Sequence, residues 1–128
     1  MLKPRLFLLL SALAFPACVV DTDHGDDYGT LVLQWTINRV DDPSECRGVD
    51  VMSAHVETFD GHDVADGEAP CENFETQIDL PEDDYHADVV LLDRGGDAAT
   101  TEVPTDDFSI YAGRDTVIRV DFPEDSFF

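Results

Sequence analysis

The sequence has very few basic residues: seven lysines and arginines stand against 29 aspartates and glutamates, so its formal net charge is −22. The only lysine is Lys3, and residues 18–128 contain five arginines and all 29 acidic residues, a formal charge of −24. Nucleic acids and anionic lipid surfaces are bound by cationic protein surfaces. This deficit therefore excludes nucleic acid as a partner, and it excludes electrostatic attraction to an anionic membrane surface.

A long apolar run is also missing. The longest apolar stretch covers residues 6–14, is interrupted only by Ser11, and is too short for a spanning helix of about 20 residues. Lys3 and Arg5 precede this stretch, which matches the basic and apolar regions of a secretory signal. We therefore predict that residues 1–17 are a signal peptide and that the chain is exported.

Cysteine is scarce: the chain contains three cysteines, so they cannot all pair with one another. Cys18 directly follows the predicted leader, with the small residue Ala17 before it. In an exported chain, acylation of Cys18 would leave Cys46 and Cys71 to pair, whereas without it one thiol would stay free in an oxidising compartment. This parity predicts a lipoprotein that is anchored in the membrane through Cys18 and contains a Cys46–Cys71 disulfide.

Two neighbouring residues bear on this anchor. Phe15 stands where lipoprotein signals usually carry leucine, so the alternative is cleavage after Ala14, which would leave Cys18 in a soluble tail. Val19 follows the cysteine, in place of the aspartate that retains lipoproteins in the inner membrane. The predicted location is therefore the bacterial outer membrane, with the protein facing the periplasm or the cell surface.

Helical periodicity is missing after the leader. Residues 18–29 are rich in aspartate and glycine and are predicted to form a flexible acidic tether. From residue 30 on, apolar residues recur at every second position, which is typical of half-buried strands separated by turns. Residues 30–128 are therefore predicted to form a single antiparallel β-sandwich of seven or eight strands. The expected strands are 31–37, 52–58, 64–70, 74–80, 85–92, 98–103, 108–111 and 116–122.

The order of these strands allows a second prediction. If each strand crosses the sandwich once, Cys46 and Cys71 fall at the same end, as a disulfide requires. The same count predicts an acidic pole at the tether end and a mixed pole, with Arg114, at the other end. The acidic pole would contain no arginine and would include the turns at 60–63, 82–84, 106–107 and 124–125.

Four features occur together along the chain: the run from Gly29 to Trp35, the Cys46 and Cys71 pair, YHADVVLLDRGGD from Tyr85 and TVIRVDFPEDSFF from Thr116. With them the chain resembles small bacterial lipoproteins that are similar to the transthyretin-like or carboxypeptidase-regulatory-like β-sandwich family. The resemblance covers nearly the whole chain after the leader. It implies an immunoglobulin-like or transthyretin-like sandwich that binds or supports, with no catalytic residues to carry over.

Acidic residues supply a candidate metal site. Two acidic turns, 82–84 and 106–107, would gather oxygen ligands of the kind that calcium prefers. The alternative is that these residues are solvated turn residues. Calcium is thus the one cofactor that the sequence suggests. The candidate ligands are Glu82, Asp83, Asp84, Asp106 and Asp107.

Histidine shows no metal-binding spacing. His24, His55, His62 and His86 are not arranged as in H-x-x-x-H, and we interpret them as surface residues. His55 and His86 occupy positions of their predicted strands that face away from the core.

No catalytic constellation stands out. The serines lack the flanking motif of a nucleophile, and acidic residues are too abundant to single out a catalytic pair. We expect no enzyme. The expected function is that of a non-catalytic cell-envelope lipoprotein, a binding or accessory module that works with an envelope protein partner. The alternative is a calcium-dependent adhesion or structural module that uses the acidic loops.

Overall fold

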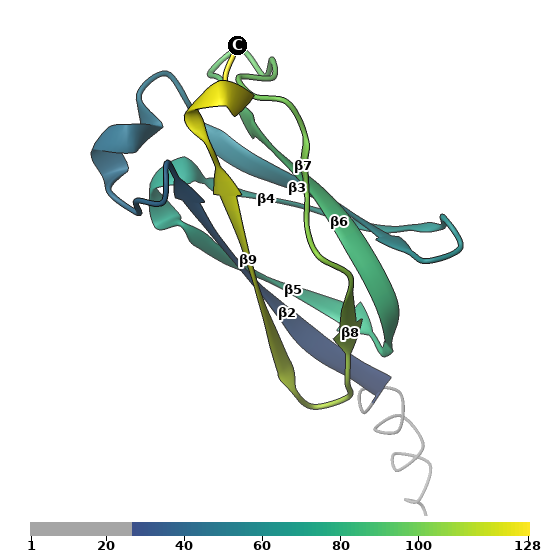
Figure 1. Cartoon of the computed structure of the whole chain (residues 1–128). Helices are drawn as coiled ribbons and strands as arrows, with labels where there is room; N and C mark the ends of the chain where they lie inside the picture. The colour runs from purple at the N-terminus through teal and green to yellow at the C-terminus, as the bar shows by residue number, and fades with distance from the viewer. Residues whose placement is uncertain (1–26) are drawn as a thin grey trace, which may run out of the picture.

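The period-two segments form strands that build two sheets packed face to face (Figure 1). A computed structural model describes residues 27–128, and the predicted signal peptide, Cys18 and most of the predicted tether lie outside this range. The described residues contain eight strands and three short 3₁₀ turns, and none of these turns is long and apolar enough to cross a membrane. The strands are β2 (Tyr28–Ile37), β3 (Val51–Thr58), β4 (Asp63–Pro70), β5 (Glu75–Pro81), β6 (Asp83–Leu92), β7 (Val103–Pro104), β8 (Phe108–Ile110) and β9 (Asp115–Phe122); the turns are η5 (Pro43–Cys46), η6 (Cys71–Asn73) and η7 (Glu124–Ser126).

The predicted β-sandwich is confirmed. One sheet has three strands in the order β5-β2-β9, and the other has five, in the order β4-β3-β6 with β7 and β8 both along the free edge of β6. Within residues 27–128, β2 pairs with β9 in parallel and the other strand pairs are antiparallel. The parallel pair departs from the expected all-antiparallel arrangement.

The parallel pair arises because the chain crosses the sandwich once, not twice, between residues 98 and 110. β7 and β8 pair in succession with the same strand, β6. The chain therefore runs in the same direction before and after Pro104. A proline is tolerated there because it lies on an edge strand. The expected strand 98–103 is reduced to isolated bridges at Ala98 and Thr100 ahead of β7.

Because the chain crosses the sandwich only once here, the charged residues that follow lie at the opposite ends from those predicted. Arg114 lies beside the start of β2, where its carbonyl oxygen accepts a 2.9 Å hydrogen bond from the Thr30 backbone N–H. Glu124 and Asp125 follow β9 and lie at the opposite end of the sandwich. The expected pole without arginine was therefore wrong from residue 108 onward.

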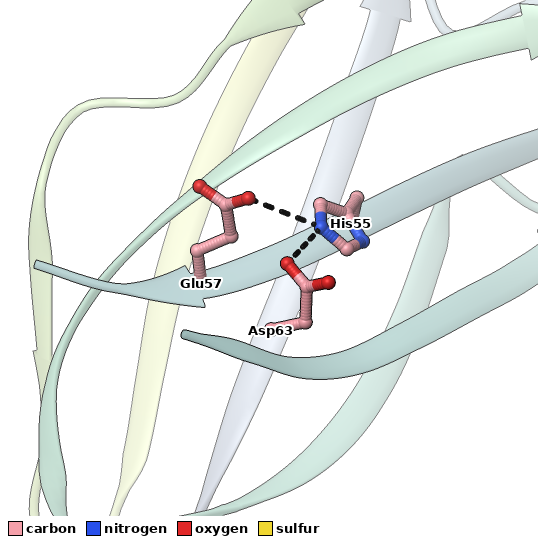
Figure 2. Close-up of side chains that lie close together, drawn as sticks. All are labelled: His55, Glu57 and Asp63. Atoms are coloured by element: carbon pink, nitrogen blue, oxygen red, sulfur yellow. Dashed lines mark hydrogen bonds and ion pairs between the residues drawn. The ribbon is translucent and has the colours of Figure 1, made fainter. Parts of the chain in front are cut away.

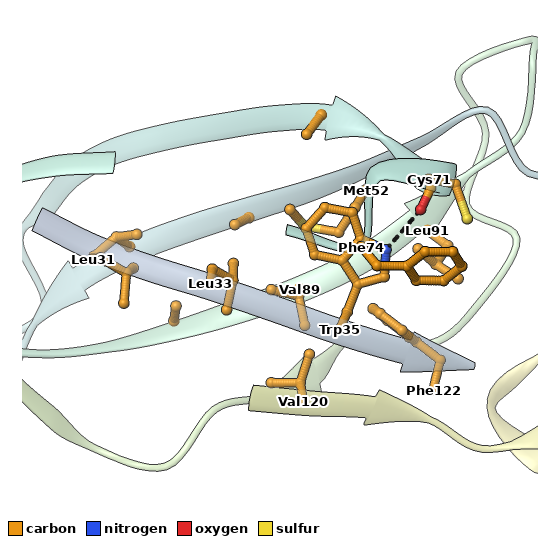
Figure 3. Packing of buried hydrophobic residues seen from close by; sticks show 14 of the residues in the cluster. Leu31, Leu33, Trp35, Met52, Cys71, Phe74, Val89, Leu91, Val120 and Phe122 are labelled. Atoms are coloured by element: carbon orange, nitrogen blue, oxygen red, sulfur yellow. Dashed lines mark hydrogen bonds between the residues drawn. The ribbon is translucent and has the colours of Figure 1, made fainter. Parts of the chain in front are cut away.

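The alternating apolar residues meet between the two sheets. Trp35 of β2 is 1% exposed and lies against Phe74, with ring centroids 6.3 Å apart. Its indole N–H donates a 3.1 Å hydrogen bond to the Cys71 carbonyl oxygen, which satisfies the one polar atom of the ring (Figure 3). Burial of such side chains is the main favourable contribution to folding. Other fully buried members of this core include Leu31, Leu33, Ile37, Met52, Leu80, Tyr85, Val89, Leu91 and Phe122.

The predicted disulfide is confirmed. Cys46 and Cys71 are bonded, with their Cα atoms 6.0 Å apart, and both are buried. The bond joins η5 to η6 at the end of the core where β2 finishes. It therefore attaches two turns to the sandwich. These turns have few strand-to-strand hydrogen bonds of their own.

The predicted tether, residues 18–29, extends too far by two residues. Tyr28 and Gly29 belong to β2, where they pair with Pro81 and Leu80. A Cβ atom on Gly29 would lie 2.3 Å from the Tyr111 carbonyl oxygen. Gly29 is therefore required by close packing of the backbone, not by the flexibility of a linker.

Candidate functional site

A hollow of about 470 Å³ lies at the end of the three-stranded sheet where β2 and β9 finish and β5 begins. Polar side chains surround it. They come from outward-facing positions of the three strands, from the loop after β2 and from η6. Three residues whose apolar side chains are buried in the core also contribute atoms to its lining. The polar lining residues are Gln34, Thr36, Asp41, Asn73, Glu75, Arg119 and Asp121, and the apolar ones are Trp35, Phe74 and Val120.

Hydrogen bonds hold several of these polar groups in place. The Gln34 side-chain amide donates to Glu75 Oε1 at 2.8 Å. Asp121 Oδ1 accepts from Thr36 Oγ1 and from the Arg39 backbone N–H, both at 2.7 Å. The carboxylates are thus oriented before any ligand arrives, which lowers the entropy lost on binding.

Arg119 is the cation of this hollow. It lies opposite Gln34 in the β2–β9 register, and in the described part of the chain no ion pair joins it to a carboxylate. Its guanidinium therefore keeps its hydrogen-bond donors for a ligand or for water. The sequence alone does not indicate this hollow, because outward polar residues on strands look like ordinary solvated positions. Only the strand register shows that Gln34 lies between Glu75 and Arg119.

The calcium candidates fall near a second hollow, of about 550 Å³, which is lined in part by Asp84 and Asp107. Asp84 Oδ1 accepts a hydrogen bond from Ser109 Oγ across the β6–β8 pair. Asp106 precedes β8 and is not part of the lining. Asp106 and Asp107 lie beside β6, because Thr105 on one side of them bonds to Ala87 and Phe108 on the other side pairs with Tyr85.

The other two calcium candidates bind backbone groups. Asp83 Oδ1 accepts from the Asp84 backbone N–H at 2.7 Å, and Glu82 Oε2 accepts from the Ala112 backbone N–H at 3.2 Å. These carboxylates have the role of turn residues, the alternative considered above. A calcium site formed by all five acids stays a prediction.

Two histidines lie together with acidic side chains on the outer face of the five-stranded sheet. His55 Nδ1 is 2.6 Å from Asp66 Oδ1. Its Nε2 is 2.9 Å from Asp63 Oδ1 and 3.2 Å from Glu57 Oε2 (Figure 2). His86 Nε2 is 3.1 Å from the other oxygen of Glu57. His55 and His86 face away from the core as predicted, but they belong to a cluster that their sequence spacing does not indicate.

The charge of this cluster acts on His55. The carboxylates of Asp66 and then Asp63, hydrogen-bonded to the ring, raise the pKa of His55 from the usual 6.5 to about 9. At neutral pH, and without any bound cation, the imidazole is therefore protonated, because the positive form is the one that the carboxylates stabilise.

Comparison with known proteins assigns the chain to no family. No family model matches the chain, and no curated protein matches it. One solved structure, described as "putative polysaccharide binding proteins (DUF1812)" from Bacteroides thetaiotaomicron, is similar to it, with a TM-score of 0.45 and 10% sequence identity over 71% of this chain and 46% of that one. The chain thus spans less than half the length of that protein, and its own class is defined by the two-sheet β-sandwich alone.

Proposed function

We propose that this chain is a non-catalytic binding module of the bacterial cell envelope, anchored through a lipid on Cys18, and that it binds a neutral, hydroxyl-rich ligand in the hollow around Gln34 and Arg119. The observation that carries the proposal is the lining of this hollow. It combines amide, guanidinium and carboxylate side chains around strand residues whose own side chains are buried in the core. Such a lining suits a molecule that presents many hydroxyl groups, because each hydroxyl both donates and accepts hydrogen bonds.

The charge of the hollow favours a neutral ligand. Asp41, Glu75 and Asp121 surround the single cation Arg119, so an anionic ligand would face more repulsion than attraction. The carboxylates accept hydrogen bonds from hydroxyl groups, and the side chains of Gln34 and Arg119 donate them. A short neutral saccharide has this chemistry.

The fluorescence of Trp35 provides the test, because it is the only tryptophan in the chain and lines the hollow. We expect saturable changes in its emission when neutral oligosaccharides are titrated into the full chain. Gln34→Ala removes a donor and also frees Glu75, so the affinity should fall by about 10-fold, the equivalent of one net hydrogen bond of about 1.4 kcal/mol.

Gln77→Ala is the matched control. Gln77 is an exposed glutamine on the same sheet, two residues from Glu75 along β5, and it does not line the hollow. This variant should bind like the unaltered protein. Equal losses in the two variants, or a preference for uronic or sulfated sugars over neutral ones, would contradict the proposal.

The proposed anchor has its own test. Replacing Cys18 by serine should abolish incorporation of a labelled fatty acid and move the protein from the membrane fraction to the soluble fraction of the cell, since two or more acyl chains are needed for stable anchoring. The mass of the mature protein distinguishes cleavage before Cys18 from cleavage after Ala14. An unlabelled native protein, or a Cys18→Ser protein that stays in the membrane fraction, would show that this cysteine is not the anchor.

A further inference from the structure

The outer face of the five-stranded sheet carries six titratable side chains in two neighbouring rows. The strand register sets one row of Asp66, His55 and Asp88 across β4, β3 and β6. It sets a second row of Asp63, Glu57 and His86 across the same strands, next to a register shift between Val56 and Glu57. Two imidazoles thus lie among four carboxylates, and neither row is evident from spacing along the chain.

We propose that this face binds a divalent transition-metal ion of the zinc class through His55 Nε2, Glu57 Oε2 and Asp63 Oδ1. These three atoms lie within 4.8 Å of one another. Figure 2 shows the carboxylates of Glu57 and Asp63 both directed at the same edge of the His55 ring. The ligand set is one imidazole nitrogen and two carboxylate oxygens, and zinc accepts both kinds of donor.

The separations of the ligand atoms fit a tetrahedral site. With zinc–ligand bonds of about 2.0 Å, neighbouring ligand atoms of a tetrahedron lie about 3.3 Å apart. The distances from His55 Nε2 to the oxygens of Asp63 and Glu57 are 2.9 and 3.2 Å. A bound ion would therefore need only small side-chain adjustments. Water, or His86 from its place on the second oxygen of Glu57, is available as the fourth ligand.

Asp66 has the role of an orienting group for the proposed ligand. Its carboxylate lies 2.6 Å from His55 Nδ1, so the Nδ1–H donates to Asp66 and the ring is held with Nε2 directed at Glu57 and Asp63. A carboxylate bonded to the far nitrogen of a metal-binding histidine fixes the tautomer and raises the basicity of the ligand nitrogen. A metal ion would occupy the place of the Nε2 proton, which is released on binding.

The donor set also indicates which ions are accepted. Calcium and magnesium take oxygen ligands, so an imidazole at the centre of the set favours zinc and its neighbours in the transition series. The side chain of His55 is 37% exposed and that of Asp63 is 74% exposed, so an ion can reach the site from solvent. The excess of negative charge on this face adds a general attraction for cations.

The test is a zinc titration of the full chain carrying Cys18→Ser, so that no free thiol binds the metal. Calcium and magnesium are present at millimolar concentration to occupy unspecific carboxylate sites. Competition with a chromophoric chelator gives the affinity, and nitrogen-15 NMR of the histidine rings reports which nitrogen is bound. We expect one zinc ion per chain, a shift of His55 Nε2, and no displacement by calcium.

Three variants locate the site. His55→Ala should weaken zinc binding by more than about 100-fold, and Asp66→Asn by about 10- to 100-fold, because Asp66 only orients the ligand. His62→Ala is the matched control, since His62 is an exposed histidine in the adjoining β3–β4 turn and outside the proposed ligand set. Its affinity should be unchanged. Equal zinc affinity of the His55→Ala and His62→Ala proteins, or release of zinc by millimolar calcium, would overturn the proposal.

Discussion

Removing the Cys46–Cys71 disulfide is expected to lower the free energy of unfolding by about 3 to 4 kcal/mol. The two cysteines are 25 residues apart, and the bond restricts this loop in the unfolded chain. In the folded chain it holds η5 against η6, with Cys71 completely buried. For a domain of this size such a loss is a large part of the total stability.

The measurement is urea unfolding of the Cys46→Ala/Cys71→Ala double variant, which avoids leaving a single free thiol. Unaltered protein in the presence of a reducing agent is the control, and it should show a similar loss. An unfolding midpoint equal to that of the oxidised protein would mean that the loop has little freedom to lose, for example because the unfolded chain keeps structure around it.

Trp35→Ala is expected to be the most destabilising single substitution in the β2 strand, with a loss of about 3 to 5 kcal/mol from the cavity and the lost burial. The side chain is 1% exposed and lies against Phe74, with ring centroids 6.3 Å apart. The substitution also removes the indole N–H that donates to the buried Cys71 carbonyl oxygen. The Cys71 carbonyl oxygen keeps its bond from the Phe74 backbone N–H, so the loss of one buried hydrogen bond adds to the cost of the cavity.

Circular dichroism during urea unfolding measures this loss without the tryptophan signal. Val117→Ala is the control, because Val117 is an apolar residue of the neighbouring strand β9 that is 46% exposed on the outer face. Its effect should stay within about 0.5 kcal/mol, as for other surface substitutions. Similar losses in the two variants would show that Trp35 is not the centre of the packing.

Trp35 and the disulfide should also depend on each other, because the indole N–H bonds to the backbone of Cys71. In the variant without the disulfide, Trp35→Ala should cost less than it does in the oxidised protein. Residues that share a contact in this way give non-additive changes in stability.

The strands of the core were predictable because one simple pattern determines them. Every second residue of β2 from Leu31 to Ile37 and of β6 from Tyr85 to Leu91 is apolar and buried, and of the residues between them only Val32 is buried as well. The direction of the last strand was not predictable from such a pattern, because Pro104 looks the same whether the chain turns there or continues past it. Only the successive pairing of β7 and β8 with β6 distinguishes these cases.

The candidate sites were hidden for a different reason. Glu57 and His86 are 29 residues apart, and they are neighbours only because β3 and β6 pair in one particular register. Gln34 and Arg119 are likewise opposite one another in the β2–β9 register. Rules based on short spacings apply to ligands within one helix or turn, and they do not detect ligands that adjacent strands bring together.

The parallel pairing of β2 with β9 has a mechanical consequence. The described chain enters the sandwich at Tyr28 and leaves β9 at Phe122, and these two points lie at opposite ends of the paired strands (Figure 1). A force that pulls them apart acts along the strands, so it loads the hydrogen bonds between the paired segments 30–37 and 115–122 together, in shear. The bonds cannot open one after another as they would in a hairpin pulled from its open end. Tension between the two ends therefore meets the combined resistance of all the hydrogen bonds between these two strands.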